Sequence, residues 1–127
     1  MNDGSFPPAA RIAGMTDLTP YLNRQDMLKD TAAQVIKDFG INGINIKFSG
    51  NAQNAYAELF EQIHPHIEQL LKGSIGRLYE LLYRIDLSES QIKKEAASAV
   101  DKTFSEILTD LILKRELLKV VMRKLYK

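Results

Sequence analysis

The sequence contains no cysteine among its 127 residues. This absence excludes disulfide bonds, metal sites built from thiolates and catalysis by a thiol. Charge of one sign is also lacking, because 17 Lys and Arg residues nearly balance 16 Asp and Glu residues. A uniformly basic coat protein and an acidic disordered chain are therefore both excluded, since each needs a strong excess of one sign.

Long apolar runs are missing as well. No stretch reaches the roughly 18 consecutive apolar residues of a membrane-spanning helix, so we expect no membrane span. The first eight residues, MNDGSFPP, have neither a basic start nor an apolar core, so the sequence predicts no signal peptide. A cytoplasmic location is the expectation, although the lack of cysteine fits the periplasm too.

The length fits one domain, because single domains cluster at roughly 100–150 residues. Residues 1–18 are rich in Gly, Pro and Ala and have little periodicity, so we expect a flexible N-terminal arm. Residues 19–127 are expected to form a single helical domain.

Apolar residues recur at three- and four-residue steps through most of this domain, which is the period of an amphipathic helix. The first predicted helix opens at Thr19-Pro20, a good cap and first-turn pair, and ends at Gly40. A second is predicted over 52–72, with a kink or a short break near Pro65. The third, over 74–86, is the most apolar segment and belongs at the centre of a bundle or under a partner.

Between the first two helices the period changes to two. Ile44, Ile46 and Phe48 alternate with polar residues over 41–48, which predicts a short extended element. Two interpretations remain open: a loop that lays its apolar side chains over the helices, or an edge strand that pairs with a partner.

The C-terminal part contains neither Gly nor Pro from 89 to 126. Ser88-Glu89-Ser90-Gln91 has the spacing of a capping box and predicts that a helix starts there. The pattern allows one helix of up to 38 residues, or two if the chain breaks around 101–110.

The near-neutral charge is the sum of two opposed parts. Residues 114–127 hold six basic residues and one acid, a net of +5, so the other 113 residues carry −4. Arg115, Lys119, Arg123 and Lys127 step by four residues and form a basic ladder opposite a wide apolar arc. The ladder is either a solvated face matched to the helix dipole or a binding surface for nucleic acid, acidic lipid or an acidic partner. Lys114 falls inside the apolar arc, where it either extends its stem to solvent or pairs with an acid across a helix interface.

Only one cluster suggests metal or acid–base chemistry. Glu61 and His64 have the spacing of the carboxylate–histidine motif of di-iron bundles, and His66 lies close by in the sequence. That site needs a second such motif, and the chain has only two histidines, so Glu61, His64 and His66 are weak candidates. No sequence motif for a catalytic nucleophile, a nucleotide or calcium is present, and we expect no cofactor.

Two runs resemble small uncharacterised helical proteins of bacteria. They are residues 81–89, LLYRIDLSE, and residues 111–123, LILKRELLKVVMR. The resemblance covers roughly the C-terminal third and implies a bacterial, cytoplasmic, single-domain protein, with no activity attached.

The sequence thus predicts an all-α fold: a compact bundle of four to five helices, with a long C-terminal helix and a short extended element near 41–48. The expected function is a non-catalytic helical protein-interaction module that self-associates or binds a helical partner. The alternatives are nucleic-acid binding through the basic ladder and a metal-dependent enzyme at Glu61, His64 and His66.

Overall fold

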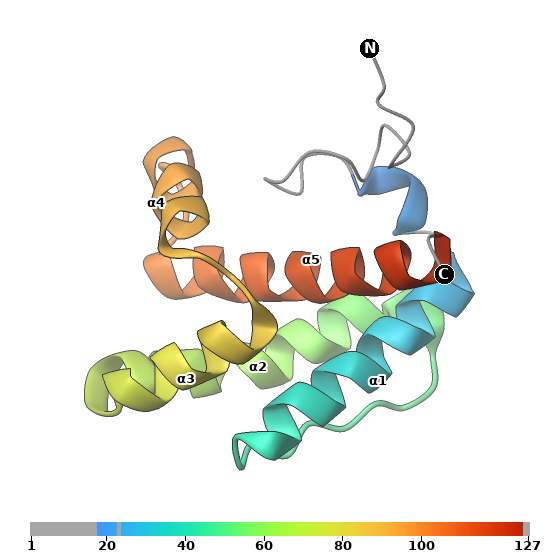
Figure 1. Ribbon diagram of the computed structural model, residues 1–127, viewed down its shortest axis with the longest axis horizontal. Helices are drawn as coiled ribbons and strands as arrows, with labels where there is room; N and C mark the ends of the chain where they lie inside the picture. The colour runs from blue at the N-terminus through green and yellow to red at the C-terminus, as the bar shows by residue number, and fades with distance from the viewer. Residues whose placement is uncertain (1–17, 23, 126–127) are drawn as a thin grey trace.

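The computed structural model describes residues 18–22 and 24–125, and within these residues every regular element is helical. The five α-helices are α1 (Gln25–Ile41), α2 (Ala55–Gly73), α3 (Ile75–Ile85), α4 (Glu89–Ser98) and α5 (Phe104–Leu125), as Figure 1 shows. Two short 3₁₀ turns, Thr19–Tyr21 and Ala52–Asn54, precede α1 and α2. The predicted all-α class and the long C-terminal helix are therefore confirmed. None of the described helices is long and apolar enough to cross a membrane.

The C-terminal helix α5 forms the centre of the fold. It contacts α1, α2, α3 and α4, and in Figure 1 it runs horizontally across the molecule, with α4 above it and α1, α2 and α3 below it. Helices on several sides explain the width of its apolar arc, because side chains around most of its circumference are covered. Its buried apolar residues are Ile107, Leu108, Leu111, Ile112, Leu113, Leu117, Leu118, Val120 and Val121.

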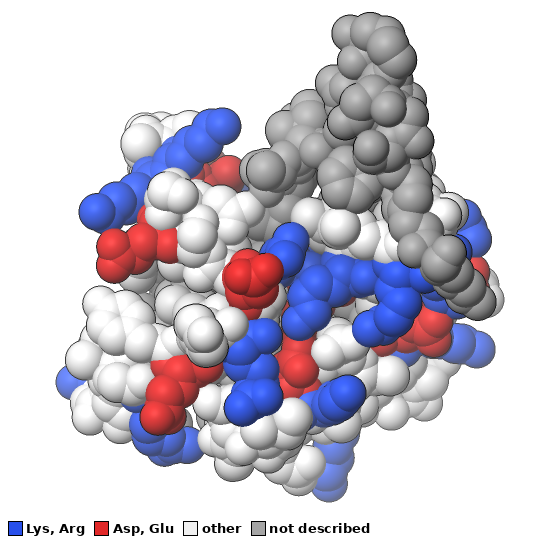
Figure 2. Space-filling view, viewed as in Figure 1, with Lys and Arg blue, Asp and Glu red and all other residues white. Residues whose placement is uncertain are grey.

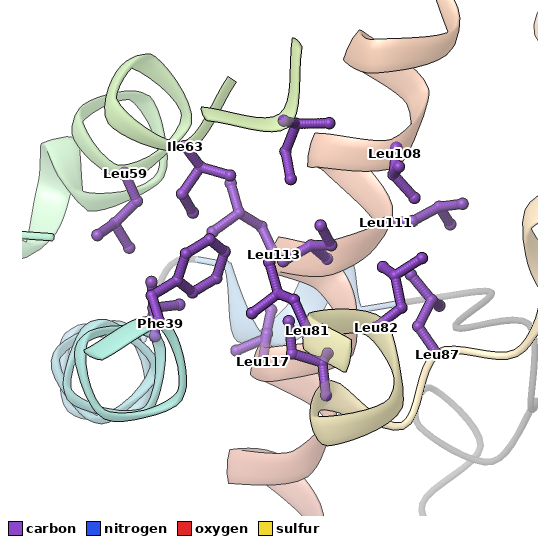
Figure 3. Close-up of a cluster of buried hydrophobic side chains, with 14 of the residues drawn as sticks. Phe39, Leu59, Ile63, Leu81, Leu82, Leu87, Leu108, Leu111, Leu113 and Leu117 are labelled. Atoms are coloured by element: carbon purple, nitrogen blue, oxygen red, sulfur yellow. The ribbon is translucent and has the colours of Figure 1, made fainter. Parts of the chain in front are cut away.

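The core collects side chains from four helices. Figure 3 shows Phe39 of α1, Leu59 and Ile63 of α2, and Leu81 and Leu82 of α3 reaching toward leucines of α5. Phe39, Ile63 and Leu81 are completely buried. Burial of each side chain of this size stabilises the folded state by roughly 1.5–3 kcal/mol, so this cluster supplies most of the hydrophobic stabilisation of the fold.

The C-terminal region forms two helices, with a break over residues 99–103. The predicted capping box at the start of α4 is present: Ser88 Oγ accepts from the Gln91 N–H, and the Gln91 side chain accepts from the Ser88 N–H. A second box starts α5, because Thr103 and Glu106 exchange the same pair of bonds. The alternative of a single 38-residue helix is therefore wrong.

The ends of α1 differ from the prediction. Thr19-Pro20 begins only a 3₁₀ turn, and α1 itself begins at Gln25. Gly40 lies inside α1, so the end predicted at Gly40 is wrong. The residue that ends the helix is Gly43, at φ 80°: its N–H bonds to the Gly40 carbonyl and the next N–H, of Ile44, bonds to the Phe39 carbonyl. This is a Schellman motif, in which a glycine takes the left-handed conformation without a steric cost.

Helix α2 continues through Pro65, so of the two expected outcomes the short break is wrong, and the kink stays a prediction. A proline removes one backbone hydrogen bond, the one to the carbonyl four residues earlier, which here belongs to Glu61. Pro65 and Glu61 are both exposed, so water reaches that part of the helix surface. The lost bond is therefore tolerated.

The extended element at 44–48 is a loop rather than a strand. Ile44 and Ile46 are buried and Phe48 is half-buried, as the period of two predicts. Its backbone is bonded by a side chain of α2: the Gln62 amide accepts from the Lys47 N–H at 2.9 Å and donates to the Lys47 carbonyl at 2.6 Å. The side chain of Gln62 thus makes the pair of backbone hydrogen bonds that a neighbouring strand would make.

We expect Gln62→Ala to lower the free energy of unfolding by about 1–2 kcal/mol, because each lost hydrogen bond contributes about 0.5–1.5 kcal/mol. Gln69→Ala is the matched control, since Gln69 is exposed on the same helix. Urea unfolding of both variants measures the difference. Equal stabilities of the two variants would contradict the role given to Gln62.

Candidate functional site

Two acidic side chains and one lysine meet where α1 packs against α5. Asp38 of α1 is 5% exposed and Glu116 of α5 is completely buried. The Lys119 ammonium lies 3.0 Å from Asp38 Oδ2 and 2.9 Å from Glu116 Oε1. The two carboxyl groups also interact with each other, so one lysine lies beside a pair of buried acids.

The environment shifts the pKa values of the two acids in opposite directions. Burial raises the pKa of Glu116 to about 8, an effect that the neighbouring Asp38 increases and Lys119 opposes. Burial would raise the pKa of Asp38 as well, but hydrogen bonds from Glu116, Gln34 and Lys119 outweigh it and hold that pKa below its usual value. Near neutral pH Glu116 is therefore protonated, while Asp38 is ionised.

Three of the four residues of the basic ladder bind polar side chains of α1 or of the residue that follows α3. Arg115 pairs with Asp86 at 2.9 Å, Lys119 with Asp38, and the Arg123 guanidinium donates to the Gln34 side chain at 3.0 Å. Lys124 adds a pair with Asp30 at 2.8 Å. Figure 2 shows the resulting mixture of blue and red side chains across the middle of this face.

These contacts give the charge split a role within the chain, because the basic C-terminal helix bonds to acids of the body. Lys127 lies outside the described residues. Nucleic-acid binding through Arg115, Lys119 and Arg123 stays a prediction, and phosphates would have to replace the partners that these side chains already have.

Lys114 also has an acidic partner. Its ammonium lies 2.9 Å from Asp110 Oδ2, one turn earlier on α5, and its side chain is 38% exposed. Tyr56 of α2 donates its hydroxyl to the same carboxylate. The pair lies along α5 itself, so the expected pairing across a helix interface is wrong.

His64 is bonded at the start of α5. Its Nε2 lies 2.9 Å from Ser105 Oγ and 3.8 Å from Glu68 Oε2, while its ring stacks on Phe60. A catalytic triad needs the acid on one ring nitrogen and the nucleophile on the other. Here both partners approach the same nitrogen, so the arrangement fixes α2 to α5 and lacks triad geometry.

The structure does not bring the three weak metal candidates together. Glu61 is exposed, His64 contacts Ser105, and His66 is half-buried. Among the residues described, no group of three His, Cys, Asp or Glu side chains is placed to hold a metal ion. The metal-dependent enzyme stays a prediction without further support.

An apolar groove of about 320 Å³ opens between α3 and α4. The ends of α2 and α5 close it, and a Glu89–Lys93 pair lies on its α4 rim. Three of its large apolar side chains remain open to solvent: Ile75 is 48% exposed, Tyr79 56% and Phe104 46%. Its other apolar lining residues are Leu71, Leu78, Leu82, Ile92, Ala96 and Leu108.

Helix α3 carries this exposed surface beyond the groove. Leu78, Leu81, Leu82 and Ile85 face the core, whereas Tyr83 is 88% exposed. Tyr83 lines a second, open hollow with Ile41, Asn42, Glu80 and Arg84. Helix α3 thus packs on the core with one face and is open on the other, so a position at the centre of the bundle is wrong, and a position under a partner stays a prediction.

Sequence reasoning did not single out Glu116. A signal was present, because Glu116 lies three and four residues from Leu113, Ile112 and Val120, all on the apolar arc of the helix. An acid at such a position is either paired or protonated in the folded protein. The partner, Asp38, lies 78 positions earlier and has no local pattern that marks it.

No known protein family, curated protein or solved structure matches the chain. Its function has to be inferred from the chemistry of its own surface.

Proposed function

We propose that the chain is a non-catalytic helical protein-interaction module that self-associates. The observation that carries this proposal is the contiguous apolar surface of α3 with its adjoining groove, defined by Ile75, Tyr79 and Phe104. Singly exposed apolar residues are ordinary on a protein surface, but a contiguous patch that includes a groove is typical of an interaction site. Aromatic side chains are also enriched at the centres of protein interfaces.

The fold changes which surface is expected to mediate self-association. The wide apolar arc of the last helix is covered by α1, α2, α3 and α4, so it offers no large surface to a partner. The surface of α3 remains exposed, and neither of its hollows is lined by Asp38, Glu116 or Lys119. Association through α3 would therefore leave the buried pair of Asp38 and Glu116 intact.

We expect Tyr79→Glu to weaken self-association at least tenfold, because it places a charge at the centre of the apolar surface. Light scattering over a concentration series measures the change in mean mass. Ala33→Glu is the matched control, since Ala33 is exposed on α1 and outside both hollows. If Tyr79→Glu and Ala33→Glu associate equally well, the proposal fails.

A further inference from the structure

The exposed apolar residues of α3 form one continuous ridge. Ile75, Tyr79 and Tyr83 are spaced four residues apart, so they form a row on the helix surface. They are 48%, 56% and 88% exposed, and so project increasingly toward the C-terminal end of the helix. Rows of this spacing are the ridges with which two helices most often interlock, at a crossing angle of about −50°.

The ridge has a hollow on each side. The apolar groove beside α4 includes Ile75 and Tyr79, and the open hollow beside α1 includes Tyr83. A ridge with adjoining hollows on the same face is self-complementary: two copies related by a two-fold axis can each place a ridge against the other's groove. A partner of different shape would have to supply both features by itself.

From this juxtaposition we infer that the partner is a second copy of the chain, docked α3 against α3 across a two-fold axis near Tyr79. This inference rests on the proposed self-association and specifies its interface. Each copy inserts its ridge, Ile75, Tyr79 and Tyr83, beside Phe104 and the groove of the other.

The exposed side chains supply a large part of the area that such a contact needs. A stable interface buries about 800 Å² on each partner. Aromatic side chains cover roughly 150–250 Å² each, and Tyr79, Tyr83 and Phe104 are all about half exposed or more. These three residues alone thus supply a substantial part of the area, and Ile75 and the groove lining add to it.

The charges of α3 are compatible with this approach. Arg77 donates to the Asn42 carbonyl at 3.3 Å, and Arg84 donates to the Asn42 side chain at 3.0 Å. Both guanidinium groups are thereby held over the turn that follows α1. Arg84 also lines the open hollow beside Tyr83 together with Glu80, so a second copy that enters this hollow meets one charge of each sign.

Because the chain has no cysteine, single introduced cysteines report the interface directly. In a two-fold dimer the same residue of both copies comes close together only near the axis. We expect Tyr79→Cys to form a disulfide-linked dimer under mild oxidation at least tenfold faster than Ala33→Cys. A disulfide needs its two Cα atoms within about 7 Å, so a fast reaction locates the axis.

A second variant is needed because Tyr79→Cys also removes the Tyr79 side chain from the proposed interface. Gly76 is exposed beside the ridge, and an added Cβ there meets no atom within 4 Å, so Gly76→Cys keeps every apolar side chain of the ridge. A short bis-maleimide should link this variant at least tenfold more efficiently than Ala33→Cys. If the unmodified chain dimerises but neither variant exceeds Ala33→Cys, the α3 crossing is overturned and self-association stands. If the unmodified chain stays monomeric, the proposed self-association fails, and the α3 dimer with it.

Discussion

Replacing Glu116 with Gln should stabilise the fold by about 3 kcal/mol at pH 7 and remove most of its loss of stability at higher pH. The pKa of Glu116 rises from 4.5 to about 8 on folding. Between these values the folded protein holds a proton that the unfolded chain has released. The free energy of unfolding therefore falls by about 1.4 kcal/mol for each pH unit in this window, and levels off above it.

The glutamine amide suits the site because it has the pattern of a protonated acid. Its NH₂ can donate to Asp38 and its oxygen can accept from Lys119, the two groups that contact Glu116 in the folded protein. The gain comes from removing the titration, with little change in packing. Glu61→Gln is the control, because Glu61 is exposed on α2 and should change stability by less than about 0.5 kcal/mol.

Urea unfolding of the three proteins from pH 5 to 9 measures these effects. The unmodified chain and Glu61→Gln should lose stability in parallel as pH rises toward 8, while Glu116→Gln stays nearly level. Asp38 has its effect at acidic pH. Because folding lowers its pKa, the folded state loses stability when acid protonates Asp38. A flat profile for the unmodified chain between pH 5 and 8 would contradict the protonated state given to Glu116.

Truncation of Phe39 to Ala should lower the free energy of unfolding by about 3–5 kcal/mol. Phe39 is completely buried and packs in the shared cluster of α1, α2, α3 and α5. Truncation removes apolar contacts and leaves a cavity that four helices cannot easily close. Because small domains are stable by about 5–15 kcal/mol in total, this single change removes a large fraction of the stability.

Phe104→Ala is the matched control for this prediction. Phe104 is 46% exposed at the start of α5, so its truncation should cost less than about 1.5 kcal/mol in the monomer. Its main effect should be on self-association, because it lines the groove beside α3. Unfolding at low protein concentration separates the two effects, and equal losses for Phe39→Ala and Phe104→Ala would contradict the assignment of core and surface.

Local signals in the sequence predicted the helices better than their ends. The capping box at Ser88 and the alternation of Ile44 and Ile46 depend only on residues close together in the sequence, and the structure confirms both. The sequence predicts the end of α1 at Gly40, whereas Gly43 is the glycine that takes the left-handed conformation. Only the bonds from Gly43 and Ile44 back into the helix decide between them.

The candidate site was harder to predict, because its parts are far apart in the sequence. The charge split marks the basic ladder, yet no local pattern in the sequence shows that Lys119 meets Asp38 and that Arg115 meets Asp86. Packing of α5 against the other helices creates these pairs. The same packing covers the apolar arc of α5, and leaves the ridge of α3 as the exposed surface.

Sedimentation equilibrium of the unmodified chain tests self-association most directly. Dimerisation predicts that the mean mass rises with concentration from 14.4 kDa toward twice that value in the micromolar range. The same experiment on Tyr79→Glu should stay near 14.4 kDa at the same concentrations. A mass of 14.4 kDa for the unmodified chain at every concentration would contradict the proposal that the α3 surface joins two copies.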